Sequence, residues 1–128
     1  MGEEQLKQEF HKAMLDIYYN ALDFPKPYRA TRFFQMVNEL GGKKAADKLL
    51  STGDRTQSGF AELILSGGGI HALQYSMEYL VLQKPWCDLF TEEQLAVAYK
   101  RLERAEFKFP EKQWICSFAI RKIIYFFR

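Results

Sequence analysis

The side chains that could do chemistry by their type and spacing are the basic residues between positions 26 and 55. Seven basic residues stand there against three acidic ones, which gives this segment a formal charge of +4. A cluster of this kind can neutralise the phosphates of a nucleic acid. The alternatives are a solvated basic face and a site for an acidic protein partner. The residues that could contact nucleic acid are Lys26, Arg29, Arg32, Lys43, Lys44, Lys48 and Arg55.

The glycine pair Gly41-Gly42 divides this basic segment. Hydrophobic spacing predicts helices over 30–40 and 43–50, so the pair would form the turn between them. This order is compatible with a helix-turn-helix whose second helix opens with Lys43 and Lys44. That helix would have only about two turns, and lysine reads base edges poorly. We therefore expect any nucleic-acid binding to tolerate many sequences.

Catalytic chemistry has few candidates. Cys87 could be a nucleophile with His11 or His71 as its base, but a reactive thiolate needs a neighbouring cation, helix N-terminus or histidine. The sequence places none of these next to Cys87, and Asp88 would oppose its ionisation. Gly67-Gly68-Gly69 lacks the lysine and the Ser or Thr of a P-loop. We predict no catalytic residue and no enzyme. The third and most distant alternative is an enzyme whose active-site residues come together only in the folded chain.

Metal ligands are also sparse. His11 and His71 are far apart, and neither belongs to an HExxH motif. Cys87 and Cys116 form no CxxC pair and have no zinc spacing. We expect no metal site and no cofactor.

The composition favours a soluble globular domain. The chain has 128 residues, of which 48% are hydrophobic and 27% charged. Eleven Phe, seven Tyr and two Trp supply large buried areas for a small core. The N-terminus lacks an apolar signal-peptide core, and the apolar stretch 114–120 is shorter than the ~20 residues of a membrane span. We expect a cytoplasmic protein with no membrane span.

Hydrophobic periodicity predicts an all-α fold, a compact bundle of about five to seven short helices. Thr91 and Gln94 have the spacing of a capping box at the start of one helix, and Pro25 follows the end of another. The segment 70–83 is expected to be the central, most buried helix. We predict a single domain over 1–128, with a helical body over 1–105. The expected helices cover 4–22, 30–40, 43–50, 59–65, 70–83 and 91–105.

The tail, residues 106–128, is apolar and basic. Its runs 114–120 and 123–127 show neither a clean helical nor a clean strand period. We favour a helix, because nothing else in the chain offers a strand to pair with, and a strand stays the alternative. So many large apolar side chains favour burial on the helical body or in a homodimer. The residues expected at that dimer interface are Trp114, Phe118, Ile123, Phe126 and Phe127.

Several runs between residues 10 and 102 resemble a group of short bacterial all-helical proteins and C-terminal domains with no established activity. Some members are associated with nuclease or restriction-type proteins. The resemblance implies a bacterial origin and a helical fold, and it implies no mechanism; the tail departs from the pattern. Among the runs that carry it are Ala13-Met14-Leu15-Asp16-Ile17-Tyr18, Ala30-Thr31-Arg32-Phe33-Phe34-Gln35-Met36-Val37, Ser76-Met77-Glu78-Tyr79-Leu80-Val81-Leu82 and Leu89-Phe90-Thr91-Glu92-Glu93-Gln94-Leu95.

These observations favour a non-catalytic helical module that binds a protein partner or a second copy of itself. The leading alternative is a nucleic-acid-binding accessory domain that uses segment 26–55. The arrangement of the basic residues distinguishes the two. Basic residues gathered on one open face would favour nucleic acid, and residues dispersed or paired with acids would not.

Overall fold

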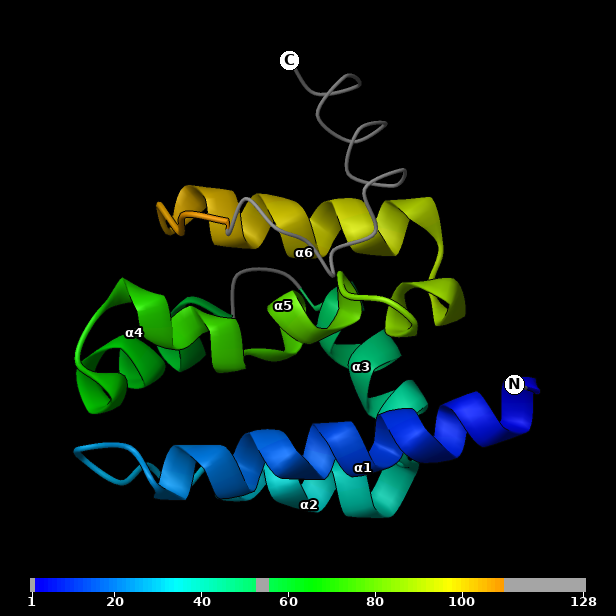
Figure 1. Ribbon diagram of the computed structural model, residues 1–128, viewed down its shortest axis with the longest axis horizontal. Coiled ribbons are helices and arrows are strands. Elements are labelled where there is room, and N and C mark those ends of the chain that lie inside the picture. Colours follow the sequence, from blue (N-terminus) through cyan, green and yellow to red (C-terminus); the bar gives the residue numbers. More distant parts are fainter. Residues whose placement is uncertain (1, 53–55, 110–128) are drawn as a thin grey trace.

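The computed structural model describes residues 2–52 and 56–109, and within these ranges it contains helices and no strand. The all-α prediction is confirmed. Four of the expected helices have nearly the expected bounds, and the fourth in the chain begins earlier than expected. The α-helices are α1 (Glu3–Leu22), α2 (Thr31–Leu40), α3 (Gly42–Ser51), α4 (Thr56–Gly67), α5 (Met77–Val81) and α6 (Glu92–Arg104), with the 3-10 helices η1 (Ile70–Tyr75) and η2 (Trp86–Leu89) (Figure 1).

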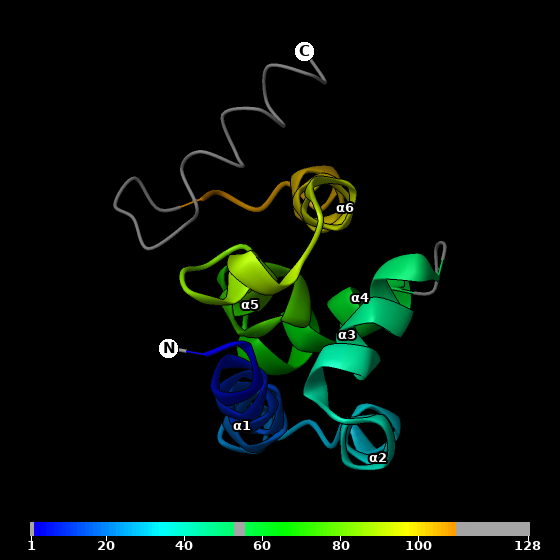
Figure 2. The same cartoon turned by 90° about the vertical axis from the view of Figure 1, so that its right-hand side faces the viewer.

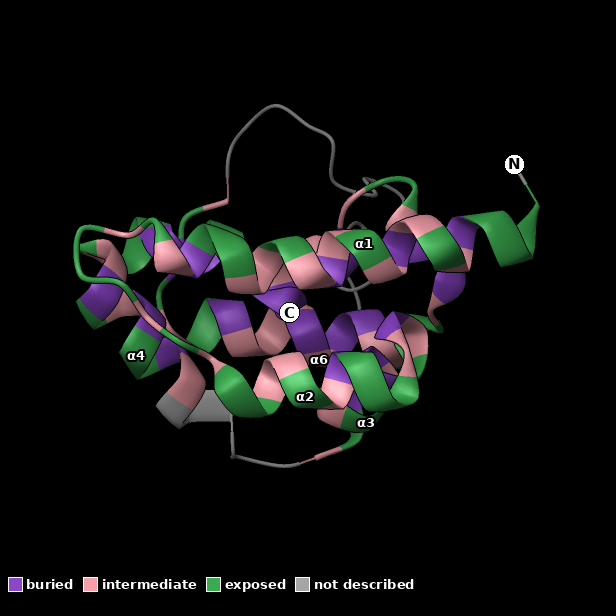
Figure 3. Cartoon of the chain, turned by 90° about the horizontal axis from the view of Figure 1, so that it is seen from below, coloured by how far each residue is buried: buried purple, intermediate pink, exposed green. Residues whose placement is uncertain are grey.

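The helices lie in three levels. Helices α1 and α2 lie side by side at one end of the molecule, and α6 lies at the opposite end (Figures 1 and 2). Helices α3, α4 and α5 fill the space between them. Because α3 contacts both α1 and α6, it connects the two outer levels. Seen from the α1–α2 side, both α1 and α2 show exposed residues toward the viewer (Figure 3).

The turn between α2 and α3 needs both of its glycines, for different reasons. Gly41 has φ +87°, which disfavours residues with a Cβ. Gly42 packs against α1, where a Cβ would lie 2.7 Å from the Cα of His11. The backbone N–H of Gly42 donates to Nδ1 of His11 at 2.9 Å. The first turn of α3 is therefore held against α1.

The segment expected as one helix over 70–83 is divided at Ser76. Ser76 is extended, with φ −85° and ψ 159°, and separates η1 from α5. Its hydroxyl donates to the carbonyl of Leu73 at 2.6 Å and accepts from the N–H of Tyr79 at 3.2 Å. Serine favours such caps because its side chain replaces a missing backbone partner. The segment is nevertheless central, since Leu73, Val81 and Leu82 are fully buried.

Helix α6 begins at the predicted capping box. The N–H of Gln94 donates to Oγ1 of Thr91 at 3.1 Å, and the N–H of Thr91 donates to Oε1 of Gln94 at 3.0 Å. The side-chain amide of Gln94 also donates to Asp47 at 2.8 Å. The cap of α6 is thus tied to α3.

The core is continuous from α1 to α6. The ring of Phe10 is fully buried and contacts the rings of Trp86 and Phe90, with centroids 5.8 and 5.4 Å away. Met14 and Leu102 are also fully buried. None of the helices in the described ranges is long and apolar enough to cross a membrane.

Candidate functional site

An apolar cavity of about 210 Å³ lies among α1, α2, α3, α4 and α5, and we call it the Glu78 cavity. It is partly open to solvent. Its walls are mainly aliphatic and aromatic, with Tyr28, Ser76 and Glu78 as the side chains that carry polar groups. Among the described residues that line it, only Glu78 carries a formal charge. The larger apolar side chains of its walls are Ile17, Phe33, Leu49, Phe60, Leu63 and Met77.

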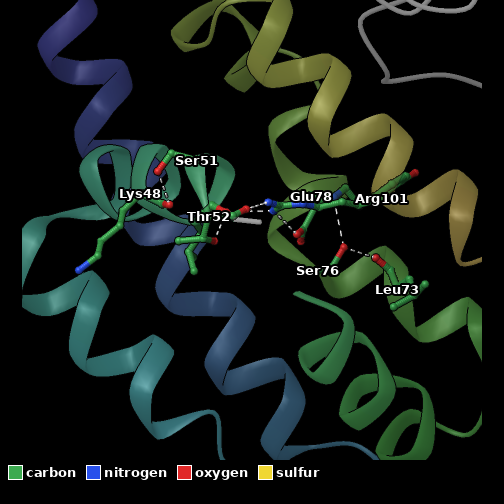
Figure 4. Close-up of polar contacts among 9 residues, drawn as sticks. Lys48, Ser51, Thr52, Leu73, Ser76, Glu78 and Arg101 are labelled. Carbon is green, nitrogen blue, oxygen red and sulfur yellow. Dashed lines mark hydrogen bonds and ion pairs between the residues drawn. The ribbon is translucent and has the colours of Figure 1, made fainter. Parts of the chain in front are cut away.

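Glu78 is a buried acid with one cationic partner among the described residues. The side chains of Glu78 and Arg101 are 4% and 11% exposed, and Nη1 of Arg101 donates to Oε2 of Glu78 at 3.1 Å. Figure 4 shows the Arg101 guanidinium, from α6, reaching Glu78 at the start of α5. A buried carboxylate without such a partner would be costly, and the Arg101 cation offsets part of that cost.

Arg101 also closes the end of α3. Its Nη1 donates to the carbonyl of Leu49 at 3.0 Å, and its Nη2 donates to the carbonyl of Thr52. The last carbonyls of a helix have no partner within the helix, and a basic side chain is a suitable donor to them. One guanidinium therefore connects α5, α6 and the end of α3 (Figure 4).

Burial dominates the protonation equilibrium of Glu78. It raises the pKa of this carboxyl above its ordinary value. The Arg101 charge lowers the pKa, as do hydrogen bonds from the Glu78 backbone and from Arg101, but these effects offset the rise only in part. Burial, with a smaller effect of the Glu62 charge, also raises the pKa of Tyr28, so its phenol is neutral at pH 7. The cavity thus presents one carboxyl and two neutral hydroxyl groups.

The basic residues predicted to contact nucleic acid are only partly gathered. Lys43 is half-buried; its ammonium lies 2.7 Å from a carboxylate oxygen of Asp47 and 4.8 Å from the ring centroid of Phe90. The length of α2, about 15 Å, separates the basic residues at its start from those after its end. Arg55 lies outside the described residues. The exposed members are Lys26, Arg29, Arg32, Lys44 and Lys48.

The second helix of this basic segment is not presented as a free recognition helix. Its first turn, with Gly42, is bonded to His11 of α1. At its C-terminal end, the carbonyls of Leu49 and of the cap residue Thr52 accept from Arg101. Only the outward side of α3, with Lys44 and Lys48, is exposed.

The other candidates from the sequence are not brought together. His11 is bonded to Gly42, His71 is exposed on η1, and Cys87 is buried in η2. No group of three or more His, Cys, Asp or Glu in residues 2–52 and 56–109 could hold a metal ion. The residues predicted at a dimer interface, Trp114, Phe118, Ile123, Phe126 and Phe127, lie outside the described residues.

The sequence alone assigns no role to Glu78 or to Arg101. One signal was present: Glu78 is the only charged residue in the stretch 72–83. A lone charge within a helix that is expected to be central needs a partner from elsewhere in the chain. The sequence does not say which cation supplies it.

Comparison of the chain with protein-family models, curated proteins and solved structures finds no match.

Proposed function

We propose that this protein is a non-catalytic binding module that takes an apolar group into the Glu78 cavity. The observation that carries the proposal is the cavity itself, which is partly open and lined mainly by apolar side chains from five helices. Binding sites for small molecules and for anchor side chains have this character: apolar walls with a few polar groups that fix orientation.

The polar groups of the cavity support binding rather than catalysis. The carboxylate of Glu78 is paired with Arg101, and the hydroxyl of Ser76 donates to the carbonyl of Leu73. A serine nucleophile instead needs a base that accepts its proton.

Gly59 offers a position on the cavity wall where a larger side chain can be added without a close contact at its Cβ. It lies on the cavity wall within α4, and a Cβ there would have no neighbouring heavy atom of the described residues within 4 Å. The substitution Gly59→Leu places a side chain in this space and removes a flexible residue from a helix. Ala61→Leu is the matched control, because Ala61 is an exposed residue of the same helix that does not line the cavity.

The test uses toluene and indene as apolar probes, observed by ligand-detected NMR on the full chain. We expect both probes to bind the native protein and the A61L variant, and G59L to lose at least most of this binding. If neither probe binds the native protein, or if G59L binds both as well as A61L does, the proposal is wrong.

The exposure of Lys44 and Lys48 on one side of α3 supports the second candidate, a sequence-tolerant contact with nucleic acid. The test is a mobility-shift titration at low and moderate salt, with duplex DNA and with RNA. The double variant Lys44→Gln/Lys48→Gln should bind more weakly and show a shallower salt dependence. The variant Lys12→Gln/Lys84→Gln removes the same charge from exposed sites elsewhere. No shift at low salt with either nucleic acid would exclude this candidate.

A further inference from the structure

We infer that the occupant of the Glu78 cavity is an uncharged aromatic ring that carries one N–H or O–H donor, such as an indole or a phenol. The inference rests on the proposed function and deepens it, because it names the chemistry of the group that is bound. Three properties of the cavity lead to it: its size, its acceptor and its charge.

The size accommodates a ring of the size of benzene or somewhat larger. A dry apolar cavity of about 150 Å³ binds benzene, and the Glu78 cavity has about 210 Å³. Its lining residues include Phe33, Phe60 and Met77, and aromatic rings and thioethers pack well against aromatic faces and edges. A flat ring of one or two cycles therefore suits this space.

The acceptor is the carboxylate of Glu78. A carboxylate has about four acceptor positions. Among the residues that the structure describes, the contact from Arg101 and the bond from the backbone N–H of Glu78 leave part of that capacity unused. The hydroxyl of Ser76, by contrast, already donates to Leu73 and accepts from Tyr79. A donor on the bound ring would thus meet an oxygen of the Glu78–Arg101 pair in an apolar setting, where such a hydrogen bond is strong.

The charge balance excludes a charged occupant. Glu78 and Arg101 neutralise each other, and the cavity walls hold no other charged side chain among the described residues. An anion in the cavity would be repelled by Glu78 without reaching a second cation there. A cation would compete with Arg101 for a carboxylate that the fold already uses. In either case one charge would be desolvated without its own partner.

The same chemistry has two sources: a free small aromatic molecule, and the Trp or Tyr side chain of a protein partner. Both present an aromatic ring with one donor. Trp and Tyr are common anchors in protein interfaces because they combine a large apolar area with one polar group.

The test compares isosteric pairs of probes on the native full chain, so it does not depend on a variant that must fold. Indole is paired with indene and phenol with toluene, and each pair differs in the donor. We expect the donor to tighten binding by roughly tenfold or more, as for a hydrogen bond to a charged group. Benzoate should not compete with indole. G59L should lose the binding of indole, which would locate the binding site at the Glu78 cavity.

Two failures are distinguishable. If indene and toluene bind as tightly as indole and phenol, the inference is wrong while the proposed function stands. If none of the probes binds, both are wrong.

N-acetyltryptophanamide separates the sources: binding at least as tight as that of indole supports a side chain of a partner, and binding of indole alone supports a free molecule. Binding of benzoate as tight as that of phenol would overturn the inference.

Discussion

Replacement of Arg101 by methionine tests whether the Glu78–Arg101 pair holds the centre of the fold. The change keeps a long side chain in α6 but removes the cation. It leaves Glu78, whose side chain is 4% exposed, without its partner, and it removes the donor from the carbonyls of Leu49 and Thr52. Removal of one member of a buried ion pair typically costs about 3–5 kcal/mol. A small domain has roughly 5–15 kcal/mol of stability in total, so the loss should be large.

The assay is urea denaturation followed by far-UV circular dichroism at pH 7. Arg101→Met should lower the free energy of unfolding by about 3–5 kcal/mol. Arg104→Met, at an exposed arginine of the same helix, should change it by less than about 0.5 kcal/mol. A loss below about 1 kcal/mol, the scale of an exposed pair, would show that the pair does not stabilise the fold as the structure indicates.

A double variant separates the cost of the unpaired charge from that of the lost contacts. In the Arg101→Met background, Glu78→Leu removes the unpaired buried carboxylate. We expect the double variant to recover part of the lost stability, because an apolar pair of similar volume can replace a buried ion pair. The Thr52 carbonyl still lacks the Arg101 donor, and the Leu49 carbonyl keeps the donation from the Thr52 hydroxyl but not that from Arg101, so recovery is incomplete. Simple additivity of the two single losses would contradict this reasoning.

The pH dependence of Arg101→Met has a defined sign. Burial already raises the pKa of Glu78, and loss of the cation raises it further. A group whose pKa is raised in the folded state contributes to stability below its unfolded pKa, which is about 4.3 for Glu. This contribution to the free energy of unfolding is lost as the pH rises through the folded-state pKa. The stability deficit of the variant should therefore be smaller near pH 5 than at pH 7, as urea titrations at both values would show.

Four other substitutions have distinct expected outcomes in the same urea assay. Gly42→Ala should cost about 1–3 kcal/mol, because its Cβ would meet the backbone of His11. Gly59→Ala, where the Cβ has open space, should be neutral or stabilise by up to about 1 kcal/mol. Equal effects of the two substitutions would refute the packing of α3 on α1. Thr91→Ala should cost about 0.5–2 kcal/mol, because it removes an acceptor of the capping box, and an unchanged midpoint would mean that α6 does not depend on this cap. Phe10→Ala should cost about 3–5 kcal/mol through the cavity left beside Trp86, and a loss near 1 kcal/mol would show a loosely packed core.

Local signals in the sequence were sufficient for most of the helices. Helix α1 ends before Pro25, the turn after α2 lies at Gly41-Gly42, and α6 begins at the box of Thr91 and Gln94. Each of these signals acts within a few residues, through backbone angles or capping bonds. Such interactions are visible in a sequence because their partners are neighbours in the chain.

The division of the central segment could not be found in this way. Apolar side chains continue on both sides of Ser76, so the helical period gives no break. Serine is compatible with a helix interior and with a cap. The structure uses the cap, in which the Ser76 hydroxyl bonds both Leu73 and Tyr79.

The candidate site could not be predicted, because its parts are far apart in the sequence. Arg101 is 23 residues from Glu78 and 52 from Leu49. The walls of the cavity come from positions between Ile17 and Glu78. Only the lone acid in the segment 72–83 hinted at a buried pair, and the choice of Arg101 over the other cations depends on the packing of α6.

Hydrogen bonds near both ends of α6 connect it to α3. Gln94 in the first turn of α6 bonds Asp47, and Arg101 in its last turn bonds the end of α3. The carbonyls that end α3 therefore gain this donor only after a chain segment about 50 residues later has docked. In native-state hydrogen exchange, we expect the amide hydrogens of α6 and of the last turn of α3 to exchange through the same opening event. On a ribosome, α3 would complete its C-terminal cap only after Arg101 had left the exit tunnel.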